Sequence, residues 1–256
     1  MTSPQDQALA LVALGRTEST NTEAHHRAGA GAAHGTLLWA EAQTKGRGRH
    51  GREWISPPGN LYASFILRPA CDAATATQLA FVAALGVGRF LSRYLDAAIP
   101  VHFKWPNDVL VSGRKIAGIL AESTMGKTQN LEWVVLGVGI NIETHPEGVE
   151  WPATSLRAQG GNPPEIAELV EVFGQSFLFC YNEWQEKGFS PIRKAWLERA
   201  AGLDEPVRVR LGEESFEGTF VGLDEDGALL VLKDGDKDPS RVTSGDVFPM
   251  KVLAGL

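Results

Sequence analysis

The chain has few cysteines, no excess of basic residues and no long hydrophobic run. Only Cys71 and Cys180 occur among its 256 residues, without a C-x-x-C pair or a histidine at zinc-ligand spacing. A disulfide scaffold and a zinc site are therefore excluded, and a reducing cytoplasm is favoured. The formal net charge of -7 argues against general nucleic-acid binding, because an acidic chain repels phosphates. No uncharged apolar run approaches the roughly 20 residues that cross a bilayer, so no membrane partner is expected.

The N-terminus also lacks the features of a targeting segment. Residues 1–16 contain several large aliphatic side chains, but they include Asp6 and have neither a basic start nor a sustained apolar core. A signal peptide is thus excluded. With 43% hydrophobic and 21% charged residues, the composition is that of a globular protein. Its length corresponds to about 1.7 ordinary domains, which predicts one large domain and one small one.

Hydrophobic periodicity predicts an α+β organisation. Short apolar runs bounded by turn residues predict strands at residues 36–43, 60–69, 101–105, 109–111, 115–122 and 131–142. Helical spacing predicts a helix at residues 75–97 and two more within residues 164–201, separated at residues 188–191. A patch of small residues at 28–33 is expected to form a flexible connection.

The pattern changes at Gly202. Beyond it, short β-runs recur at residues 207–211, 216–223, 228–232 and 241–248, and Asp-Gly pairs mark hairpins between them. We therefore predict a first domain at residues 1–202 and a small β domain at residues 203–256.

A basic, glycine-rich segment follows the strand predicted at residues 36–43. Residues 46–51 match G-x-G-x-x-G, but Pro57 and Pro58 prevent the helix that a dinucleotide-binding turn must open. Residues 45–52, here named the Gly-Arg loop, instead suit an anion, which guanidinium and backbone N–H groups would bind together. Trp54 is placed to stack on an adenine-like ring. A solvated loop, or one that binds RNA weakly, stays an alternative.

A second group of polar residues follows at the turn after residue 105. Asn107 and Asp108 are preceded by Lys104 and followed by Lys115. Asp108 could hold Mg²⁺ or the attacking group, and the lysines could neutralise charge on phosphoryl oxygens. Taken alone, the segment favours an ordinary hairpin turn with exposed lysines.

Four motifs occur together in a fixed order: Ser19-Thr20-Asn21, QTKGRGRHGREW at 43–54, KWPNDVLVSGRKIAGILAES at 104–123, and GVGINI at 137–142. In this order and spacing they resemble the biotin protein ligases, over most of the chain from about residue 18. The resemblance implies an α+β fold, in which a mixed-sheet catalytic domain of the biotin/lipoate ligase type precedes a small SH3-like β-barrel.

The resemblance also implies an activity. Family members make biotinyl-5′-AMP from biotin and MgATP, release pyrophosphate, and pass biotin to one lysine of a carboxylase's biotin carboxyl carrier domain. Biotin, ATP and Mg²⁺ are therefore expected. The protein is not expected to have a dedicated metal site; Mg²⁺ would bind together with ATP, at a position near Asp108. A lipoate-protein ligase is the nearest alternative, and an RNA-binding module that uses the Gly-Arg loop is the alternative outside enzymes.

Individual residues acquire roles from the same resemblance. The catalytic ones are Lys115, Arg47, Arg49 and Asp108. Those assigned to biotin are Ser19, Thr20, Asn21, Gln43, Arg47, Gly48, Arg49 and Lys115. Those assigned to the nucleotide are Trp54, Asn107 and Asn141.

Some relatives carry a DNA-binding helix-turn-helix domain before the Ser-Thr-Asn motif. Only 18 residues precede Ser19 in this sequence. We therefore expect a monofunctional ligase that does not bind operator DNA, which a gel-shift measurement at physiological salt would test. Relatives include monomers and homodimers, so the oligomeric state stays open.

Overall fold

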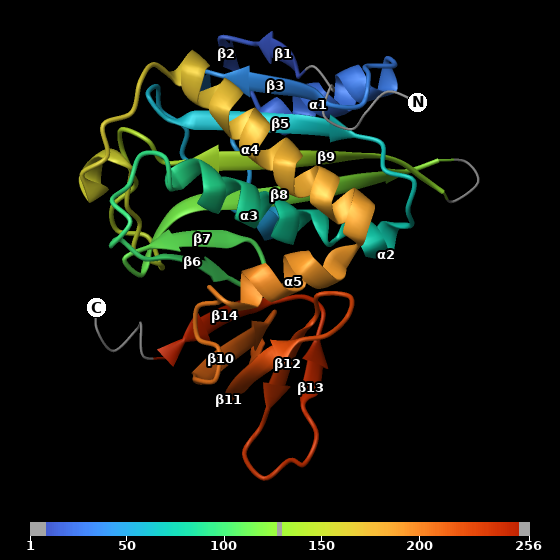
Figure 1. Cartoon of the computed structure of the whole chain (residues 1–256), viewed down its shortest axis with the longest axis vertical. Helices are drawn as coiled ribbons and strands as arrows, with labels where there is room; N and C mark the ends of the chain where they lie inside the picture. The colour runs from blue at the N-terminus through green and yellow to red at the C-terminus, as the bar shows by residue number, and fades with distance from the viewer. Residues whose placement is uncertain (1–8, 127–129, 251–256) are drawn as a thin grey trace.

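A large mixed sheet and a smaller antiparallel sheet organise the chain (Figure 1). The computed structural model describes residues 9–126 and 130–250. The first eight residues, part of the stretch tested above as a signal peptide, and the last six residues of the predicted β domain lie outside these ranges.

The large sheet has seven strands. In spatial order they are β1 (Ala10–Ala13), β3 (Thr36–Ala40), β5 (Leu61–Leu67), β9 (Leu131–Ile140), β8 (Arg114–Met125), β7 (Asp108–Val111) and β6 (Val101–Lys104). β1 pairs parallel with β3, and every other neighbouring pair is antiparallel. The predicted mixed sheet is thus confirmed. All six predicted segments contribute a strand to it, although Ala42–Gln43, at the end of the first segment, pair with Arg16–Thr17 in a separate two-stranded sheet.

Strand alternation gives the two faces of this sheet different roles. Phe65 and Leu136 point into the main core, beneath α3 (Leu79–Leu91) and α4 (Ile166–Lys187). Their neighbours Ser64 and Gly137 point to the opposite face, where α1 (Thr20–Gly29) lies. Figure 1 shows α3 and α4 in front of the sheet and α1 behind it. On this face of the sheet α1 packs mainly on β3, β5 and β9, so the remaining part of the face is available for a ligand.

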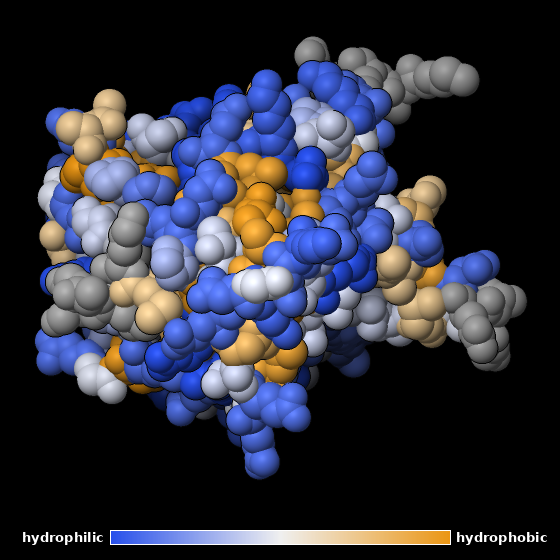
Figure 2. All heavy atoms as spheres, turned by 90° about the horizontal axis from the view of Figure 1, so that it is seen from below, coloured by the Kyte–Doolittle hydropathy of each residue, from blue (hydrophilic) through white to orange (hydrophobic). Residues whose placement is uncertain are grey.

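The smaller sheet contains the last five strands. In spatial order they are β13 (Ser240–Val242), β12 (Leu229–Leu232), β11 (Glu214–Leu223), β10 (Pro206–Leu211) and β14 (Asp246–Pro249). It packs on α5 (Phe189–Leu197), and Val207 and Phe220 join the main core. Figure 2, viewed from this side, shows hydrophobic side chains in separate patches on a mostly hydrophilic surface. The predicted C-terminal SH3-like unit is confirmed, and it is continuous with the first core.

The sequence interpretation was wrong at residues 28–33, because α1 was missed. This helix runs from Thr20 to Gly29, and Ala28 is only 2% exposed. The following turn is held by the bond from the N–H of Ala32 to the carbonyl of Arg27, so no flexible connection begins there. Ser19 as N-cap and the Glu23–Arg27 pair were the available signals.

The predicted helix at 75–97 is shorter and divided. It comprises α2 (Ala73–Ala76), which Asp72 caps, and α3, which ends at Leu91. Its glycines have a packing reason, since a Cβ on Gly86 would lie 2.9 Å from the Cα of Phe177 in α4. By length and hydropathy alone Ala73–Leu91 could cross a membrane, but 72% of this stretch is buried inside the fold, as in a core helix. The prediction of two helices around residue 188 is confirmed by α4 and α5.

Candidate active site

One pocket of about 410 Å³ opens on the face of the large sheet that α1 covers in part. Its walls come from the N-terminal end of α1, the Gly-Arg loop, strands β8 and β9, the segment 146–153 and the C-terminal sheet. Every residue to which the sequence assigned a role lines it: Ser19, Thr20, Asn21, Gln43, Arg47, Gly48, Arg49, Trp54, Asn107, Asp108, Lys115 and Asn141. The fold therefore brings four separate motifs to one place.

One end of the pocket is neutral and polar. Gln43 lies in β4 (Ala42–Gln43), which pairs with β2 (Arg16–Thr17) and so faces the start of α1. Its Oε1 accepts from the backbone N–H of Thr20 at 2.8 Å and from the Thr20 hydroxyl at 3.1 Å. Its Nε2 donates to Ser56 at 3.0 Å. These bonds fix the amide orientation of Gln43, leaving this end with oriented hydroxyl and amide groups rather than charge.

Glycines on β8 and β9 make room for two larger side chains. Gly118 and Gly139 face each other across the strands, and the indole ring of Trp54 lies over both. A Cβ on Gly139 would lie 2.4 Å from Trp54 Nε1, and one on Gly137 would lie 2.1 Å from Asn21 Oδ1. Because these glycines have no side chain, Trp54 and Asn21 can lie directly against the strands.

The other end of the pocket is built on a carboxylate between two lysines. Asp108 lies 2.9 Å from Lys104 Nζ and 2.6 Å from Lys115 Nζ. Burial opposes ionisation of Asp108, but the two ammonium groups outweigh it and lower the pKa of this carboxyl well below its usual range. Lys104 is only 5% exposed, so the expectation of exposed lysines at an ordinary turn was wrong. Two cations around one anion leave this end with net positive charge.

A β-bulge aims Lys115 at this end. Leu110 of β7 opposes Lys115, and Val109 opposes Ala117, so Ile116 is an extra residue in β8. Such a bulge changes the direction of the neighbouring side chains. The backbone of Lys115 is also fixed, because its N–H donates to the carbonyl of Pro152 and its carbonyl accepts from Thr154.

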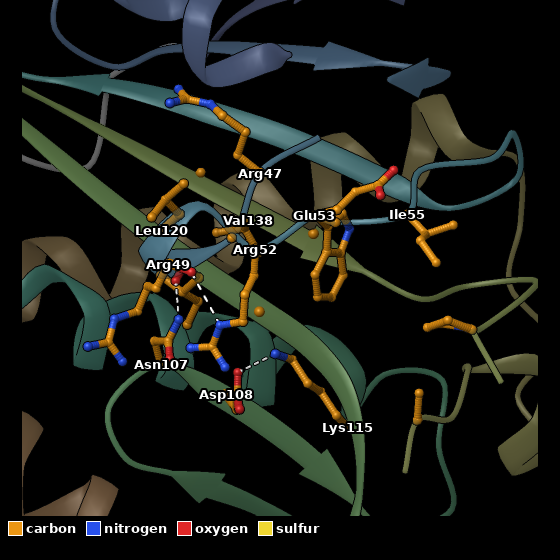
Figure 3. A pocket seen from close by; sticks show the side chains of 18 of the residues that line it. Arg47, Arg49, Arg52, Glu53, Ile55, Asn107, Asp108, Lys115, Leu120 and Val138 are labelled. Carbon is orange, nitrogen blue, oxygen red and sulfur yellow. Dashed lines mark hydrogen bonds and ion pairs between the residues drawn. The ribbon is translucent and has the colours of Figure 1, made fainter. Parts of the chain in front are cut away.

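The arginines of the Gly-Arg loop do not converge. Arg47 donates to Glu122 at 3.2 Å, whereas Arg49 donates to the carbonyl of Gly245 at 3.1 Å. Figure 3 shows Arg47 at the far side of the pocket from Asp108 and Lys115. The guanidinium groups of Arg47 and Arg49 therefore contact different walls of the pocket: Arg47 reaches a carboxylate of β8, whereas Arg49 reaches a backbone carbonyl just before the last strand of the C-terminal sheet.

Known families match both parts of this chain. Residues 14–141 match the biotin/lipoate A/B protein ligase family, and residues 202–249 match the biotin protein ligase C terminal domain. The biotin--[acetyl-CoA-carboxylase] ligase of Paracoccus denitrificans is 40% identical over 240 residues, which cover 92% of this chain and 98% of that protein. The chain belongs to the biotin protein ligase family.

Other similar ligases extend this finding. The biotin--[acetyl-CoA-carboxylase] ligase of Mycobacterium tuberculosis is 32% identical and covers 94% of this chain and 89% of its own. The structure of biotin protein ligase from Aquifex aeolicus in complex with biotin and ATP has a TM-score of 0.77 and 31% identity, covering 93% of this chain and 97% of that one. The predicted family is confirmed, and it is favoured over a lipoate-protein ligase.

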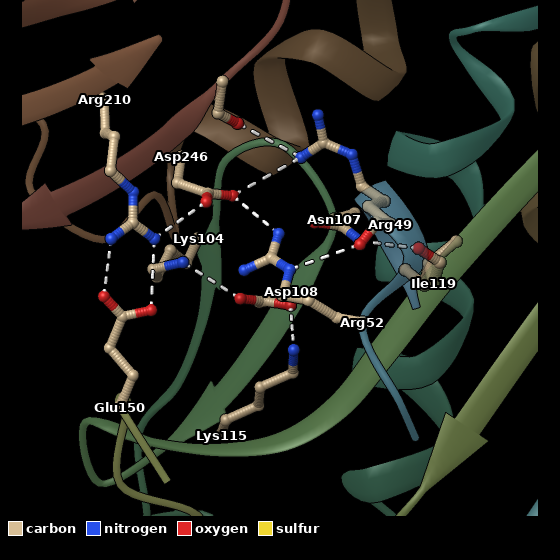
Figure 4. Close-up of polar contacts among 11 residues, drawn as sticks. Arg49, Arg52, Lys104, Asn107, Asp108, Lys115, Ile119, Glu150, Arg210 and Asp246 are labelled. Atoms are coloured by element: carbon tan, nitrogen blue, oxygen red, sulfur yellow. Dashed lines mark hydrogen bonds and ion pairs between the residues drawn. The ribbon is translucent and has the colours of Figure 1, made fainter. Parts of the chain in front are cut away.

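The C-terminal sheet of this ligase also contributes to the pocket, which the sequence interpretation missed. Asp246 and Phe248 of β14 line it. Asp246 accepts from Arg52 at 2.9 Å and from Arg210 at 3.1 Å, and Arg210 also holds Glu150 (Figure 4). No local motif signals these contacts, because they join residues far apart in the chain.

The pocket does not offer Mg²⁺ a ready site near Asp108. Both oxygens of this carboxylate already contact ammonium groups, which also repel a divalent cation. Within residues 9–126 and 130–250, no cluster of three or more His, Cys, Asp or Glu side chains could hold a metal ion. The expected position for Mg²⁺ at Asp108 is thus not supported.

The Asp108 ion pairs should make the stability of this ligase sensitive to acid. The folded pKa of Asp108 lies below the unfolded value of about 3.9, so the pairs stabilise the fold above that pH, and the stabilisation is lost as the pH falls. We expect the melting temperature to fall more steeply below about pH 5 in the wild type than in Asp108→Asn. Thermal melts from pH 7 to 3 measure this, with Glu225→Gln, an exposed carboxylate, as control. Parallel profiles for wild type and Asp108→Asn would contradict the expectation.

Proposed function

We propose that this ligase activates biotin with ATP and then transfers biotin to a lysine of a biotin carboxyl carrier domain. One observation supports this most: a single pocket joins the neutral, hydrogen-bonding end at Thr20 and Gln43 to the positively charged end at Lys115. Biotin has matching parts, namely a neutral ureido ring and a carboxylate joined by an apolar chain. Ser19, Thr20 and Gln43 are proposed to bind the ureido ring.

The proposed reaction has two steps. A carboxylate oxygen of biotin attacks the α-phosphorus of ATP, which forms the acyl–phosphate bond and breaks the bond to pyrophosphate. The neutral amine of the acceptor lysine then attacks the acyl carbon, an amide forms, AMP leaves with the bonding electron pair, and the amine loses one proton to solvent. Both reactants of the first step are anions, so Lys115 is proposed to neutralise the charge where they meet.

The nucleotide is proposed to lie against Trp54, Asn107 and Asn141. Carbonyl groups fix both amides, since Asn107 donates to Ile119 at 2.6 Å and Asn141 donates to Thr154 at 3.0 Å. Trp54 presents a broad aromatic face, and Lys115 Nζ lies 5.4 Å from its ring centroid. The ring and the ammonium group would thus bind neighbouring parts of one nucleotide.

Asp108 is proposed to act as a positioning residue. A carboxyl whose pKa is lowered by two lysines is a weak proton acceptor, which makes it a poor base for the acceptor lysine. Its contacts with Lys104 and Lys115 instead fix where the positive charge lies.

A transfer assay tests this function. The protein is mixed with MgATP, labelled biotin and a biotin carrier domain, and in parallel with labelled lipoate and a lipoyl domain. We expect label on the biotin carrier domain and release of pyrophosphate that depends on biotin. Transfer to the lipoyl domain alone would overturn the proposal.

Arg49→Gly should weaken containment of the adenylate. In the fold, Arg49 lines the pocket and ties the Gly-Arg loop to Gly245, the residue just before β14. Losing a hydrogen bond from a charged donor weakens the closed state about tenfold. We expect a comparable rise in biotin label on a bystander protein, measured by blot.

The control for this variant is Lys45→Gly. Lys45 belongs to the same loop, but its ion pair with Glu18 is exposed, so its loss should leave the labelling of bystanders unchanged. Label that stays confined to the carrier domain in Arg49→Gly would remove the containment role.

Partner, location and domain boundary are proposed on the same basis. A carboxylase carrier domain is the proposed acceptor, and both cysteines are free, as in a cytoplasmic protein. We place the domain boundary after Gly202, just before β10, although the two units share one core.

A further inference from the structure

Glu122 gathers contacts from two other parts of the ligase, α1 and the Gly-Arg loop. It lies in β8 on the same face as Gly118 and Leu120, beyond the residues that line the pocket. Its Oε2 accepts from Asn21 Nδ2 at 2.7 Å and from Arg47 Nη2 at 3.2 Å. This carboxylate therefore contacts two residues of the pocket wall without lining the pocket itself.

A third group, His25, faces the same oxygen. Its Nε2 lies 3.7 Å from Glu122 Oε2, while its Nδ1 accepts from the indole N–H of Trp133 at 3.2 Å. In neutral His25 the proton is therefore assigned to Nε2, where it points at Glu122. The neighbouring His25, followed by Asn21 and Arg47, lowers the pKa of Glu122 against the effect of partial burial, which favours the ionised carboxylate.

The contact with Asn21 orients the neutral end of the pocket. Asn21 Nδ2 contacts Glu122 and the carbonyl of Leu120, and its Oδ1 lies 2.6 Å from Ser64 Oγ. Ser64 Oγ is in turn 2.8 Å from Thr20 Oγ1, which contacts Gln43. Through these contacts, Asn21 links the carboxylate of Glu122 to Ser64 and Thr20 at the biotin-binding end.

The contact with Arg47 fixes one end of the Gly-Arg loop. Arg47 pairs with Glu53 through an isolated backbone bridge, and its guanidinium crosses to Glu122, 75 residues away in the chain. The loop thus rests on the same oxygen that orients Asn21. Displacing either contact would alter the electrostatic field that the other one meets.

We propose that Glu122 is a positioning residue, whose single carboxylate couples closure of the Gly-Arg loop to the arrangement of the biotin-binding end. The inference rests on the proposed function only where it names biotin. It predicts that Glu122 acts on substrate binding and loop closure, whereas the chemical step depends on Lys115 at the other end of the pocket.

The test compares Glu122→Gln with Glu122→Ala. Glutamine keeps an acceptor for Asn21 but removes the charge that holds Arg47, and alanine removes both. We expect the KM for biotin to rise about tenfold in Glu122→Gln and further in Glu122→Ala, with kcat within about twofold of wild type. Without any ligand, trypsin should cut residues 45–52 faster in both variants, as mass spectrometry of the fragments would show.

The matched control is Glu18→Gln. It removes one carboxylate that pairs with the same loop, but the Glu18–Lys45 pair is exposed, so KM and cleavage should stay at wild-type values. An unchanged KM and unchanged cleavage in Glu122→Gln would overturn the proposal, as would a fall in kcat alone. If the wild type transferred no biotin, the proposed function would fail, while the ligand-free cleavage assay would still decide whether Glu122 holds the loop.

Discussion

Lys115→Ala is expected to lower the rate of adenylate formation about 100-fold, the usual effect of removing one preorganised charge from a transition state. Lys115 is the cation that the bulge in β8 aims at the charged end of the pocket, 2.6 Å from Asp108 and beside Trp54. Release of pyrophosphate from biotin and ATP measures the effect. At saturating substrates the lower rate should appear in kcat. The reason is that the biotin carboxylate and the α-phosphate of ATP approach each other most closely in the transition state, where the charge of Lys115 stabilises them most.

The fold should survive this change. The backbone of Lys115 is held by Pro152 and Thr154, and Asp108 keeps its second lysine, Lys104. A melting temperature close to wild type is therefore expected, and Lys45→Ala, which removes an exposed cation of the Gly-Arg loop, should retain activity. Pyrophosphate release at the wild-type rate would exclude Lys115 from the mechanism.

Asp108→Ala is expected to destabilise the fold by about 3–5 kcal/mol, since it leaves a buried cation without its partner. The side chain of Lys104 is only 6% exposed, and the rings of Trp151 and Phe248 lie nearby. Neither ring replaces a carboxylate. Urea unfolding at pH 7 measures the loss, and adenylate formation should fall as well because Lys115 also loses its partner.

Two comparisons separate this effect from simple loss of packing. Glu143→Ala breaks the exposed pair with Arg157 and should cost only about 0–1 kcal/mol. The double variant Asp108→Ala/Lys104→Met removes the buried charge altogether and should recover much of the stability. A loss of less than about 1 kcal/mol in Asp108→Ala would show that Lys104 finds another partner or reaches solvent.

Local patterns carried the prediction of most elements, whereas the resemblance to the biotin protein ligases carried that of the pocket residues. Periodicity located the strands around residues 61–67 and 131–140 and the helices on either side of Gly188, because alternation and helical spacing need only neighbouring residues. It failed at α1, whose apolar stripe is short and whose N-cap, Ser19, had been interpreted only as part of a binding motif.

The directions of the charged side chains could not be predicted in the same way. Arg47 and Arg49 are two residues apart, yet one contacts Glu122 and the other Gly245, which lies 196 residues from it in the chain. The sequence predicted that Lys104 is an exposed turn residue. In the structure it is buried, and Phe248 of the C-terminal sheet lies next to it. The partner and the burial of each of these side chains depend on which part of the folded chain lies opposite it. A local sequence pattern does not contain that information.

The sequence by itself determined the fold class, the family and the residues that meet in the pocket, because these depend on local periodicity and on motifs of fixed spacing. The tertiary structure decided what each of those residues contacts there. It made Asp108 a buried partner of two lysines, joined Asn21 to Ser64 and Glu122, and gave Glu122 its place between loop and pocket. The physical reason is that hydrogen bonds and ion pairs are short-ranged and directional, so they form only after strand order and packing have brought distant residues together.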